Sequence, residues 1–517
     1  MASAIGRGGR LKQTKPKMLL FSHICSPQYV TGAEKLLLFM IRELLPAYAC
    51  TLVVPTEGVI AGHARKLGVP VIVQDIPLVV PLYLALPHLH EELAAKLREP
   101  AWGELIRLLL REQPQVVLVN TCVHPLPAIA GKALGIPVVW SAMEAICETP
   151  HTAASAALIE AHADFVLGIS ETTLAPLRTP GLLPKTTLIP PSWHQAELQP
   201  ESWTRHRANR RRQFGFAEHE RVIGYISSSI FEGKGLEHFM QMAVRTAAVH
   251  PHARYLIVGN PVDAPYFERC LGIARDAGVL ERFRWIRFEE QVATVYPAMD
   301  LLVVPSLMAE GFGMTALEGM ACGKPVVVYG SGGLAEIGQA TGNAAYVAPT
   351  GDYDGLAGRV SSLLADEALL QAVGAQNARE AQAVYGIAAY RERLRRFLDV
   401  LKPQAPRLPR TVKGSGPAIY LLERAGLLRP FRTMAAFAAV GYRPEDVRLV
   451  PDAFLAGLPV GEPIGDAPRT ARRSRKHRRT RRGQRGRRGS KLRRGRRAGK
   501  ARRGKPAGGR KKRRRAS

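Results

Sequence analysis

The chain has 517 residues, 46% of them hydrophobic, which is more than one hydrophobic core normally organises, so two domains are expected. Its formal net charge is +30, yet 27 of its 73 Lys and Arg residues lie between Ala467 and Ser517, a stretch without Asp or Glu. The rest of the chain carries 46 basic and 43 acidic residues, which excludes a uniformly polybasic protein and confines any argument about polyanion binding to the tail.

The cysteine pattern and the apolar segments bear on the compartment. The six cysteines form no C-x-x-C pair and no Cys/His set with metal spacing, which favours buried free thiols in a reducing compartment. The basic residues 1–16 are not followed by a long apolar segment, so no signal peptide is expected. The most apolar stretch, residues 67–87, contains Gln74, Asp75 and four prolines, which is unlike a membrane-spanning helix. We therefore expect a cytoplasmic protein, with contact at an anionic membrane or assembly surface still allowed.

The first half of the chain alternates short apolar runs with helical stretches. Continuous Val/Ile/Leu runs bounded by Gly and Pro predict strands buried on both faces, and their alternation with helices predicts a parallel sheet. The predicted strands are residues 17–23, 50–54, 69–74, 115–120, 136–141 and 164–170, and residues 32–45 are a predicted helix. The pattern breaks at "IPPSW", residues 189–193, and an Arg-rich polar stretch follows, which predicts a domain boundary there.

The strand and helix pattern then starts again. Predicted strands are residues 221–227, 254–259, 282–288, 300–306, 325–330 and 344–348, with helices at 235–249 and 387–401. Two successive α/β sheets of similar size place a cleft between them, and ligands of such folds lie beyond the carboxyl ends of the strands. The predicted layout is a basic extension (1–16), a first domain (17–195), a second domain (196–402), a Pro-rich segment with short helices and no assigned function (403–466), and a disordered Arg/Lys/Gly-rich tail without aromatic residues (467–517).

The stretch "EGFGMTALEGMACGKP", Glu310–Pro325, carries the strongest chemical signal. Glu310 follows a predicted strand that ends at Pro305 and Ser306, and Glu318 lies on a helix predicted from about Met314 to Ala321. Eight helical residues span ~12 Å, whereas the two carboxyl groups of glycosidases lie roughly 5–9.5 Å apart. The spacing therefore favours two carboxylates at opposite ends of one long ligand. A solvated surface carboxylate is the alternative for either glutamate alone.

The string "PSLMAEGFGMTALEGMACGKPVV" resembles the E-x7-E signature of family-4, or group 1, retaining glycosyltransferases, and the resemblance covers about residues 17–400. It implies an α/β fold of two facing Rossmann-like, doubly wound domains (GT-B type) with an interdomain cleft. By resemblance, Glu310 holds sugar hydroxyls near the reacting carbon and Glu318 holds the ribose hydroxyls. Lys234, in "EGKG", would neutralise the donor diphosphate, although an isolated Lys is also compatible with a solvated surface charge.

Other positions match the donor site of that family. Gly32, in "TGAEK", would approach the diphosphate, with a plain helix start as the alternative, and "LIVGN" would end near the nucleotide base. The catalytic residues predicted are Glu310 and Lys234, and the predicted donor-binding residues are Gly32, Gly235, Gly259, Asn260, Gly311, Phe312, Gly313, Met314, Thr315 and Glu318. Glycines let the backbone approach a ligand closely, and free amides at the start of a helix favour an anion.

Two positions depart from the family. Ser229 stands where the family usually has an Arg five residues before the Lys, so one diphosphate cation is missing or supplied from elsewhere. Met143, followed by Glu144, stands where the family often has a His that contacts the donor sugar. His124 is a possible substitute, with a structural His in a loop as the alternative. Asn120, His124 and Glu144 are the predicted acceptor side.

The resemblance implies transfer of a sugar from a nucleotide-diphosphate sugar to a saccharide, lipid-linked or protein acceptor with retention of configuration. No Asp-x-Asp metal site is visible near the predicted cleft, so transfer without a metal ion or a further cofactor is expected. The apolar residues 75–93 suggest contact with a lipid-linked acceptor, although packing onto the core is favoured. The tail suggests a polyanion partner, namely nucleic acid, an anionic polymer or an anionic membrane. The rival functions are an inactive glycosyltransferase-fold protein that binds polyanions through its tail, and a sugar phosphorylase, for which no Lys is placed to hold a covalent cofactor.

Overall fold

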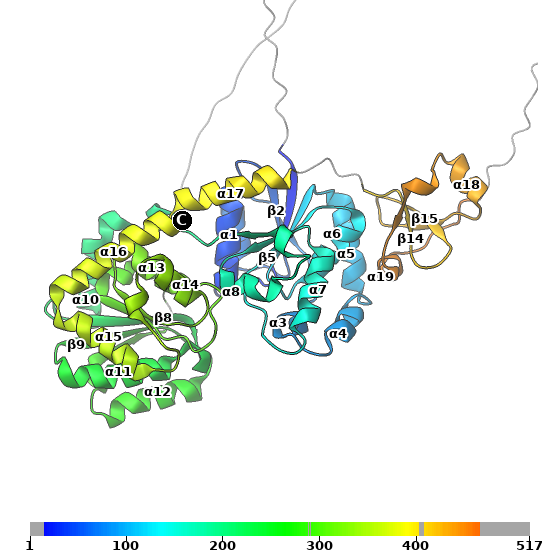
Figure 1. Cartoon of the computed structure of the whole chain (residues 1–517). Helices are drawn as coiled ribbons and strands as arrows, with labels where there is room; N and C mark the ends of the chain where they lie inside the picture. Colours follow the sequence, from blue (N-terminus) through cyan, green and yellow to red (C-terminus); the bar gives the residue numbers. More distant parts are fainter. Residues whose placement is uncertain (1–14, 288, 290, 403–407, 466–517) are drawn as a thin grey trace, which may run out of the picture. The chain divides into compact units, whose positions relative to one another are not determined.

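The computed structural model describes residues 15–287, 289, 291–402 and 408–465 (Figure 1). Within these residues the chain forms a seven-stranded sheet, a six-stranded sheet and a smaller four-stranded sheet. All described strand pairs of the two larger sheets are parallel, with helices between consecutive strands. The predicted fold class, two Rossmann-like α/β domains, is confirmed. The predicted extension at 1–16 lies almost wholly outside the described residues, as does the predicted tail at 467–517.

The first parallel sheet has the strand order β3-β2-β1-β4-β5-β6-β7. Its strands are β1 (Lys17–Phe21), β2 (Ala49–Val54), β3 (Val71–Val73), β4 (Val116–Asn120), β5 (Val138–Ala142), β6 (Phe165–Gly168) and β7 (Thr186–Leu188). Its helices are α1 (Gly32–Leu44), α2 (Val59–Lys66), α3 (Val80–Leu84), α4 (Leu89–Lys96), α5 (Pro100–Glu112), α6 (Pro125–Leu134), α7 (Thr152–His162) and α8 (Glu171–Leu174). Every residue of β4 and β5 is buried, as expected for central strands covered by helices on both faces.

The second parallel sheet has the order β10-β9-β8-β11-β12-β13. Its strands are β8 (Arg221–Ile230), β9 (Ala253–Pro261), β10 (Phe283–Ile286), β11 (Leu301–Val304), β12 (Val326–Tyr329) and β13 (Val347–Ala348). The helices of this part are α9 (Gln195–Leu198), α10 (Trp203–Phe214), α11 (Leu236–Val249), α12 (Ala264–Asp276), α13 (Met314–Ala321), α14 (Gly333–Ala340), α15 (Tyr353–Ala365), α16 (Glu367–Tyr385) and α17 (Ile387–Leu401). The strand order reverses next to β8 and β11, the position at which ligands bind in such sheets.

Helix α17 packs on the first domain rather than on the second. Its buried side chains Tyr390, Leu394, Phe397 and Leu401 belong to the same apolar cluster as residues of β1, β2 and α1. Arg391 of α17 also forms an ion pair with Glu43 of α1. The sequence assigned this helix to the second domain because it follows that domain in the chain, but its apolar stripe is complementary to the first.

The Pro-rich segment is only partly as expected: a short helix lies within residues 434–442, whereas residues 418–428, for which the sequence also suggested a helix, contain strand structure. Helices α18 (Met434–Ala439) and α19 (Asp452–Ala456) accompany a four-stranded sheet made of β14 (Thr411–Lys413), β15 (Ile419–Leu422), β16 (Leu428–Pro430) and β17 (Val447–Leu449). Its apolar residues join the core of the first domain, and Trp102 Nε1 of α5 donates to the carbonyl of Ala453 at 2.8 Å. The sheet escaped prediction because strands of three or four residues broken by Gly and Pro carry little periodicity.

The predicted lipid-contacting stretch, residues 75–93, forms α3 and the start of α4. Ile76, Val79, Leu82 and Leu89 are buried in the core of the first domain, as the favoured packing alternative predicts. Val80 is one of its exposed apolar residues. No helix in the described part of the chain is long and apolar enough to cross a membrane.

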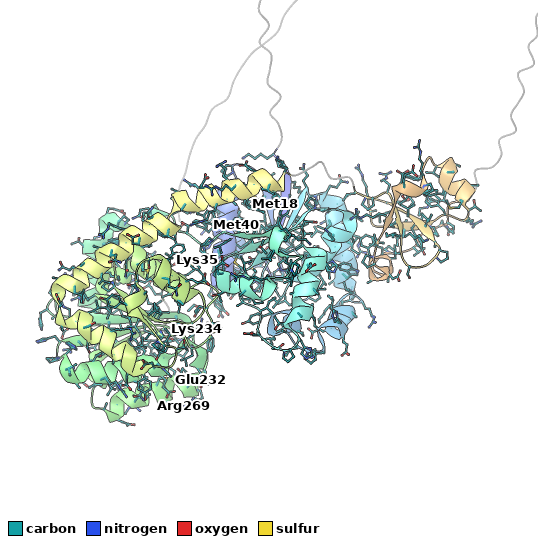
Figure 2. All side chains as sticks on the ribbon, in the orientation of Figure 1. Met18, Lys35, Met40, Glu232, Lys234 and Arg269 are labelled. Atoms are coloured by element: carbon teal, nitrogen blue, oxygen red, sulfur yellow. The ribbon has the colours of Figure 1, made fainter. Side chains whose placement is uncertain are left out.

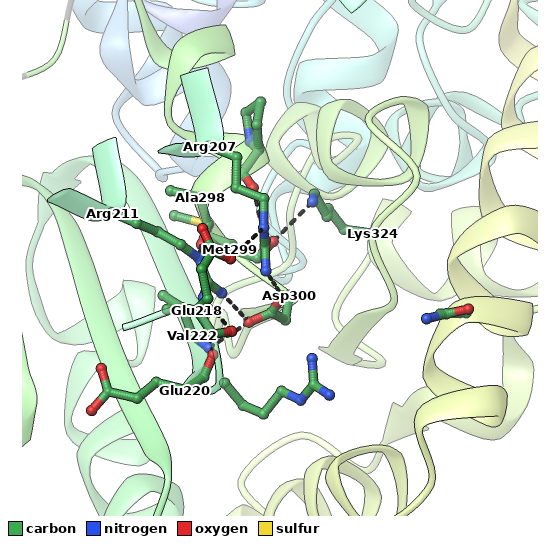
Figure 3. A network of polar contacts seen from close by, with 12 residues as sticks. Arg207, Arg211, Glu218, Glu220, Val222, Ala298, Met299, Asp300 and Lys324 are labelled. Carbon is green, nitrogen blue, oxygen red and sulfur yellow. Dashed lines mark hydrogen bonds and ion pairs between the residues drawn. The ribbon is translucent and has the colours of Figure 1, made fainter. Parts of the chain in front are cut away.

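The Arg-rich stretch after the first domain forms α10, which is anchored to the second sheet by a buried polar network (Figure 3). The side chain of Arg211 is only 1% exposed and pairs with one carboxylate oxygen of Asp300. Arg207 donates to the other Asp300 oxygen at 2.9 Å, and the backbone amide of Val222 on β8 also donates to Asp300, at 2.8 Å. These arginines therefore help to hold the second domain together.

Candidate active site

Glu310 lies in the loop between β11 and α13, where the parallel strands of the second sheet end. Ser306, just past the end of β11, donates its hydroxyl to Glu310 Oε1 at 2.8 Å. The backbone of the same loop is fixed by the amide of Gly333, which donates to the Glu310 carbonyl at 2.8 Å. The side chain of Glu310 is 20% exposed, so its carboxylate is partly shielded from water but accessible to a ligand.

Lys234 pairs with this carboxylate. It ends a short 3-10 helix, Glu232–Lys234, that follows β8, and its Nζ lies 2.6 Å from Glu310 Oε1. The next residue, Gly235, has a φ of +68°, and a Cβ there would lie 1.8 Å from the carbonyl oxygen of Pro305. Only glycine therefore allows the loops after β8 and β11 to approach closely enough for the pair to form.

Glu318 lies on α13 and has partners from both domains. Tyr296 donates its hydroxyl to Glu318 Oε2 at 2.9 Å. Lys35, on α1 of the first domain, forms an ion pair with Glu318 Oε1. Lys35 and Lys234 are labelled in Figure 2. The two glutamates of the E-x7-E spacing are thus each paired with a lysine, one from each domain.

A cavity of about 250 Å³ lies at this position, between the two parallel sheets. The predicted residues that line it are Gly32, Lys234, Glu310, Gly311, Phe312, Gly313, Met314 and Thr315. The first domain contributes Gly32, Ala33, Leu36, Met143 and Ile169 to its wall. The structure thus brings most of the predicted donor residues together around one space, although their roles stay predictions.

The remaining predicted donor residues lie around this cavity without lining it. Gly259, on β9, approaches β8 so closely that a Cβ would lie 2.1 Å from the Ser227 carbonyl. Asn260 is the register partner of Ser229, and its Oδ1 accepts a hydrogen bond from Arg287 Nε at 3.1 Å. Gly235 allows the loops after β8 and β11 to approach each other, and Glu318 binds Lys35 and Tyr296.

The predicted acceptor residues lie at the end of β4 or shortly after β4 and β5 of the first sheet. Asn120 donates to the carbonyl of Ala33 at 3.3 Å, which ties the end of β4 to the first turn of α1. His124 is 2% exposed, and its ring nitrogens have no hydrogen-bond partner among the described residues. Burial lowers the pKa of His124 to about 3, so its ring is neutral. His124 is thus buried and is not among the residues that line the cavity, which is compatible with the structural alternative.

Glu144 lies beside the loop that bears Glu310. A Cβ at Gly311 would lie 2.5 Å from the carbonyl oxygen of Met143 and 3.5 Å from Glu144 Cα, so the Glu310 loop abuts the end of β5. Burial raises the pKa of Glu144 to about 7. Met143 itself is 7% exposed and packs in an apolar cluster with Phe312. Where the family often has a His, the cavity wall is therefore a thioether.

Several contacts that shape the site were not predicted. Ser170, after β6, donates its hydroxyl to the Gly311 carbonyl. Glu336 of α14 accepts hydrogen bonds from the backbone amides of Glu171 and Thr172 at 2.8 and 2.7 Å. Sequence showed only the Ser-Glu-Thr-Thr capping pattern at the start of α8 and could not name its partner. No group of three or more His, Cys, Asp or Glu side chains placed to hold a metal occurs among the residues described.

The part of the chain with this loop pair matches a known family. Residues 206–381, which contain Lys234, Glu310 and Glu318, match the family described as group 1 glycosyl transferases. The predicted resemblance is thereby confirmed at the level of group 1 for this segment, and the assignment to family 4 stays a prediction.

Relatives and solved structures extend the comparison. N-acetyl-alpha-D-glucosaminyl L-malate synthase of Bacillus anthracis is 30% identical over 170 residues, 33% of this chain and 42% of the relative. D-inositol 3-phosphate glycosyltransferase of Mycobacteroides abscessus is 35% identical over 134 residues, 25% of this chain and 28% of the relative. The chain thus spans less than half the length of these relatives. A crystal structure of Anabaena HepE in complex with UDP has a TM-score of 0.62 at 17% identity, covers 74% of this chain and all of that one, and shows a common two-domain fold.

Proposed function

We propose that the protein transfers a sugar from a nucleoside-diphosphate sugar to an acceptor hydroxyl, with retention of configuration and without a metal ion or a further cofactor. The observation that carries the proposal is the Lys234–Glu310 pair at 2.6 Å on the wall of the cavity that both domains enclose. The two residues lie in loops that follow two strands of one sheet. The lysine would bind the phosphates of such a donor, and the glutamate would bind its sugar.

The departing nucleoside diphosphate gains negative charge as the sugar acquires oxocarbenium character. Lys234 supplies a positive charge to it, and the amides of Met314 and Thr315 at the start of α13, a helix of eight residues, supply the positive end of a helix dipole. Such donors stabilise a transition state strongly because they are already oriented. We propose that these groups take the place of a metal ion.

Lys234 and Glu310 would exchange partners when the donor binds. In the empty site the ammonium neutralises the carboxylate at 2.6 Å. A bound diphosphate competes for the ammonium, and the released carboxylate of Glu310 then accepts hydrogen bonds from sugar hydroxyls. In the transfer step, the bond between the anomeric carbon and the phosphate oxygen breaks as the acceptor oxygen attacks from the same face. The acceptor proton passes to the leaving phosphate oxygen.

The acceptor and the tail are the other parts of the proposal. The relatives named above differ in their acceptors, so a saccharide, lipid-linked or protein acceptor remains proposed for this chain, bound on the side of Asn120, His124 and Glu144. Binding of a polyanion through residues 467–517 stays a prediction about residues outside those described. The inactive-protein alternative rests on Ser229 and Met143, which stand where the family often has an Arg and a His, whereas the Lys234–Glu310 pair on the cavity wall favours an active site.

The test uses the full-length protein. Thermal shifts with UDP, GDP, ADP and their common sugar conjugates, each with EDTA and with Mg²⁺, identify the donor, because a ligand far above its Kd stabilises the fold by a few kcal/mol. Release of the nucleoside diphosphate from the conjugate then measures turnover. Glu310→Ala should abolish turnover, whereas Glu268→Ala, an exposed glutamate of α12, should not. Absence of any nucleotide binding by the wild type would refute the proposal, and a strict Mg²⁺ requirement would refute its metal-independent part.

A further inference from the structure

The donor site as described has one cation fewer than its ligand needs. The end of β8 presents Ser227, Ser228 and Ser229, and Ser227 uses its hydroxyl to donate to the Ser229 carbonyl at 2.8 Å. Among the residues that line the cavity, Lys234 is the one basic side chain. A nucleoside diphosphate carries more negative charge than one ammonium neutralises, and charges that are partly desolvated are costly unless they are paired.

Lys35 enters this region from the opposite domain. It lies in the first turn of α1, whose neighbouring residues Gly32, Ala33 and Leu36 line the cavity. The start of α1 is fixed by a capping box between Thr31 and Glu34. Because Leu36 packs inward and the side chain of Lys35 is 56% exposed, the lysine is free to extend along the cleft to Glu318.

Both carboxylate oxygens of Glu318 already have a partner, so a ribose hydroxyl has to displace one of them. Tyr296 donates to Glu318 Oε2 at 2.9 Å, and Lys35 occupies Oε1. The hydroxyl of Tyr296 belongs to a side chain that is 1% exposed, so it is not easily displaced. A ribose hydroxyl that binds this carboxylate must therefore compete with the exposed lysine. The negative charge of Glu318 raises the pKa of Lys35, which keeps the ammonium protonated in the empty site.

We propose that Lys35 is the second cation of the donor site and acts on the diphosphate after the ribose has displaced it from Glu318. This inference rests on the proposed function. The ammonium stays attached to the first turn of α1, next to Gly32 and Ala33 on the cavity wall, and turns toward the phosphates. Lys35 thus supplies, from the first domain, the positive charge that is missing at Ser229.

Arg287 is the rival for this role. It follows β10, and its Nε donates at 3.1 Å to Oδ1 of Asn260, which is the register partner of Ser229. Neither Arg287 nor Asn260 lines the cavity, however, whereas the helical turn that bears Lys35 does. The position of the first turn of α1 therefore favours Lys35, and the experiment includes Arg287 as a separate variant.

Calorimetric titration of the full-length protein with UDP and with uridine tests the inference; if the wild type prefers another base, the corresponding diphosphate and nucleoside are used. Lys35→Gln should weaken UDP binding about 10-fold to 100-fold, since a hydrogen bond to a charged group is worth ~1.5–3 kcal/mol. Uridine should bind equally well or better, because Glu318 loses its competitor. Lys35→Arg should restore most of the UDP affinity.

Arg42→Gln is the matched control, because Arg42 lies on the same helix, is exposed and pairs with Glu197. It should change neither affinity. An unchanged UDP affinity in Lys35→Gln would overturn the inference. So would an equal loss of UDP and uridine, which would make Lys35 a structural latch, or a loss in Arg287→Gln alone. If the wild type binds no nucleoside diphosphate at all, the proposed function itself fails, which is a different result from these.

Discussion

Replacing Glu310 by Gln should make the protein bind a nucleoside diphosphate more tightly while it abolishes sugar transfer. Glu310 neutralises Lys234 in the empty site, with Nζ and Oε1 2.6 Å apart. A diphosphate without its sugar gains nothing from Glu310 but has to separate Lys234 from it. Gln keeps the size of the side chain and can still accept the hydrogen bond of Ser306, so the change removes mainly the charge.

The size of the effect follows from the geometry of the pair. Two unit charges 2.6 Å apart attract by roughly 6 kcal/mol at an effective dielectric constant of 20, which is an upper bound. The side chains of Lys234 and Glu310 are 24% and 20% exposed, so water screens much of this energy. A net cost of about 1–2 kcal/mol for separating the pair is consistent with measured partly exposed ion pairs. It corresponds to binding tighter by about 5-fold to 30-fold.

Isothermal titration of the wild type, Glu310→Gln, Lys234→Met and the double variant measures this coupling as a double-mutant cycle. The gain from Glu310→Gln should be present with Lys234 and absent in the Lys234→Met background. Turnover of the sugar conjugate should fall by at least ~100-fold in Glu310→Gln. Weaker diphosphate binding by Glu310→Gln, or an equal gain in diphosphate affinity in the Lys234→Met background, would show that Glu310 does not compete with the diphosphate for Lys234.

The other predictions concern the loop, the anchor of α10 and the acidic residue next to the site. Gly311→Ala should lower turnover at least ~10-fold, because its methyl group would lie 2.5 Å from the Met143 carbonyl oxygen and push the Glu310 loop away; steady-state kinetics measures this. Asp300→Asn should reduce the free energy of unfolding by about 3 kcal/mol in urea titrations, because Arg211 loses its buried counter-charge. Burial raises the pKa of Glu144 to about 7, so the contribution of this carboxyl to stability is fully present below about pH 4.5 and is lost as the pH rises through 7. Relative to Glu144→Gln, the free energy of unfolding of the wild type should fall by up to about 3 kcal/mol between these pH values. The same pH dependence of unfolding in both proteins would contradict this.

Local sequence was sufficient where local physics decides the structure. The fully apolar runs in β4 and β11 could only be buried strands, and the loop after β11 followed from a strand, two glycines and a helix start. The sequence therefore placed Glu310 and Lys234 at the ends of two strands of one sheet, although the ion pair between them was not predicted. Their roles rest on resemblance, and no structural fact assigns them.

Contacts between distant parts of the chain could not be predicted in the same way. Lys35 and Glu318 lie 283 positions apart, and each looks like an ordinary helix-surface charge in its own segment. The arginines of α10 belong to the polar stretch at the predicted domain boundary, yet Arg211 is almost completely buried, because Asp300 and several backbone carbonyls satisfy its guanidinium. Such burial depends on the shape of a partner surface that no local pattern encodes.

The two lysine–glutamate pairs of the empty site are arranged in the same way. Each carboxylate that would bind hydroxyls is neutralised by an ammonium that would bind phosphate, within one domain for Lys234–Glu310 and between domains for Lys35–Glu318. A nucleoside alone offers hydroxyls to Glu318 but nothing to the displaced lysine, and inorganic phosphate attracts the lysines but leaves both carboxylates unpaired. Only a ligand with hydroxyls on both sides of a diphosphate gives new partners to both lysines and both carboxylates at once. On this reasoning, the intact nucleotide sugar should bind with more free energy than the separate affinities of nucleoside and phosphate provide.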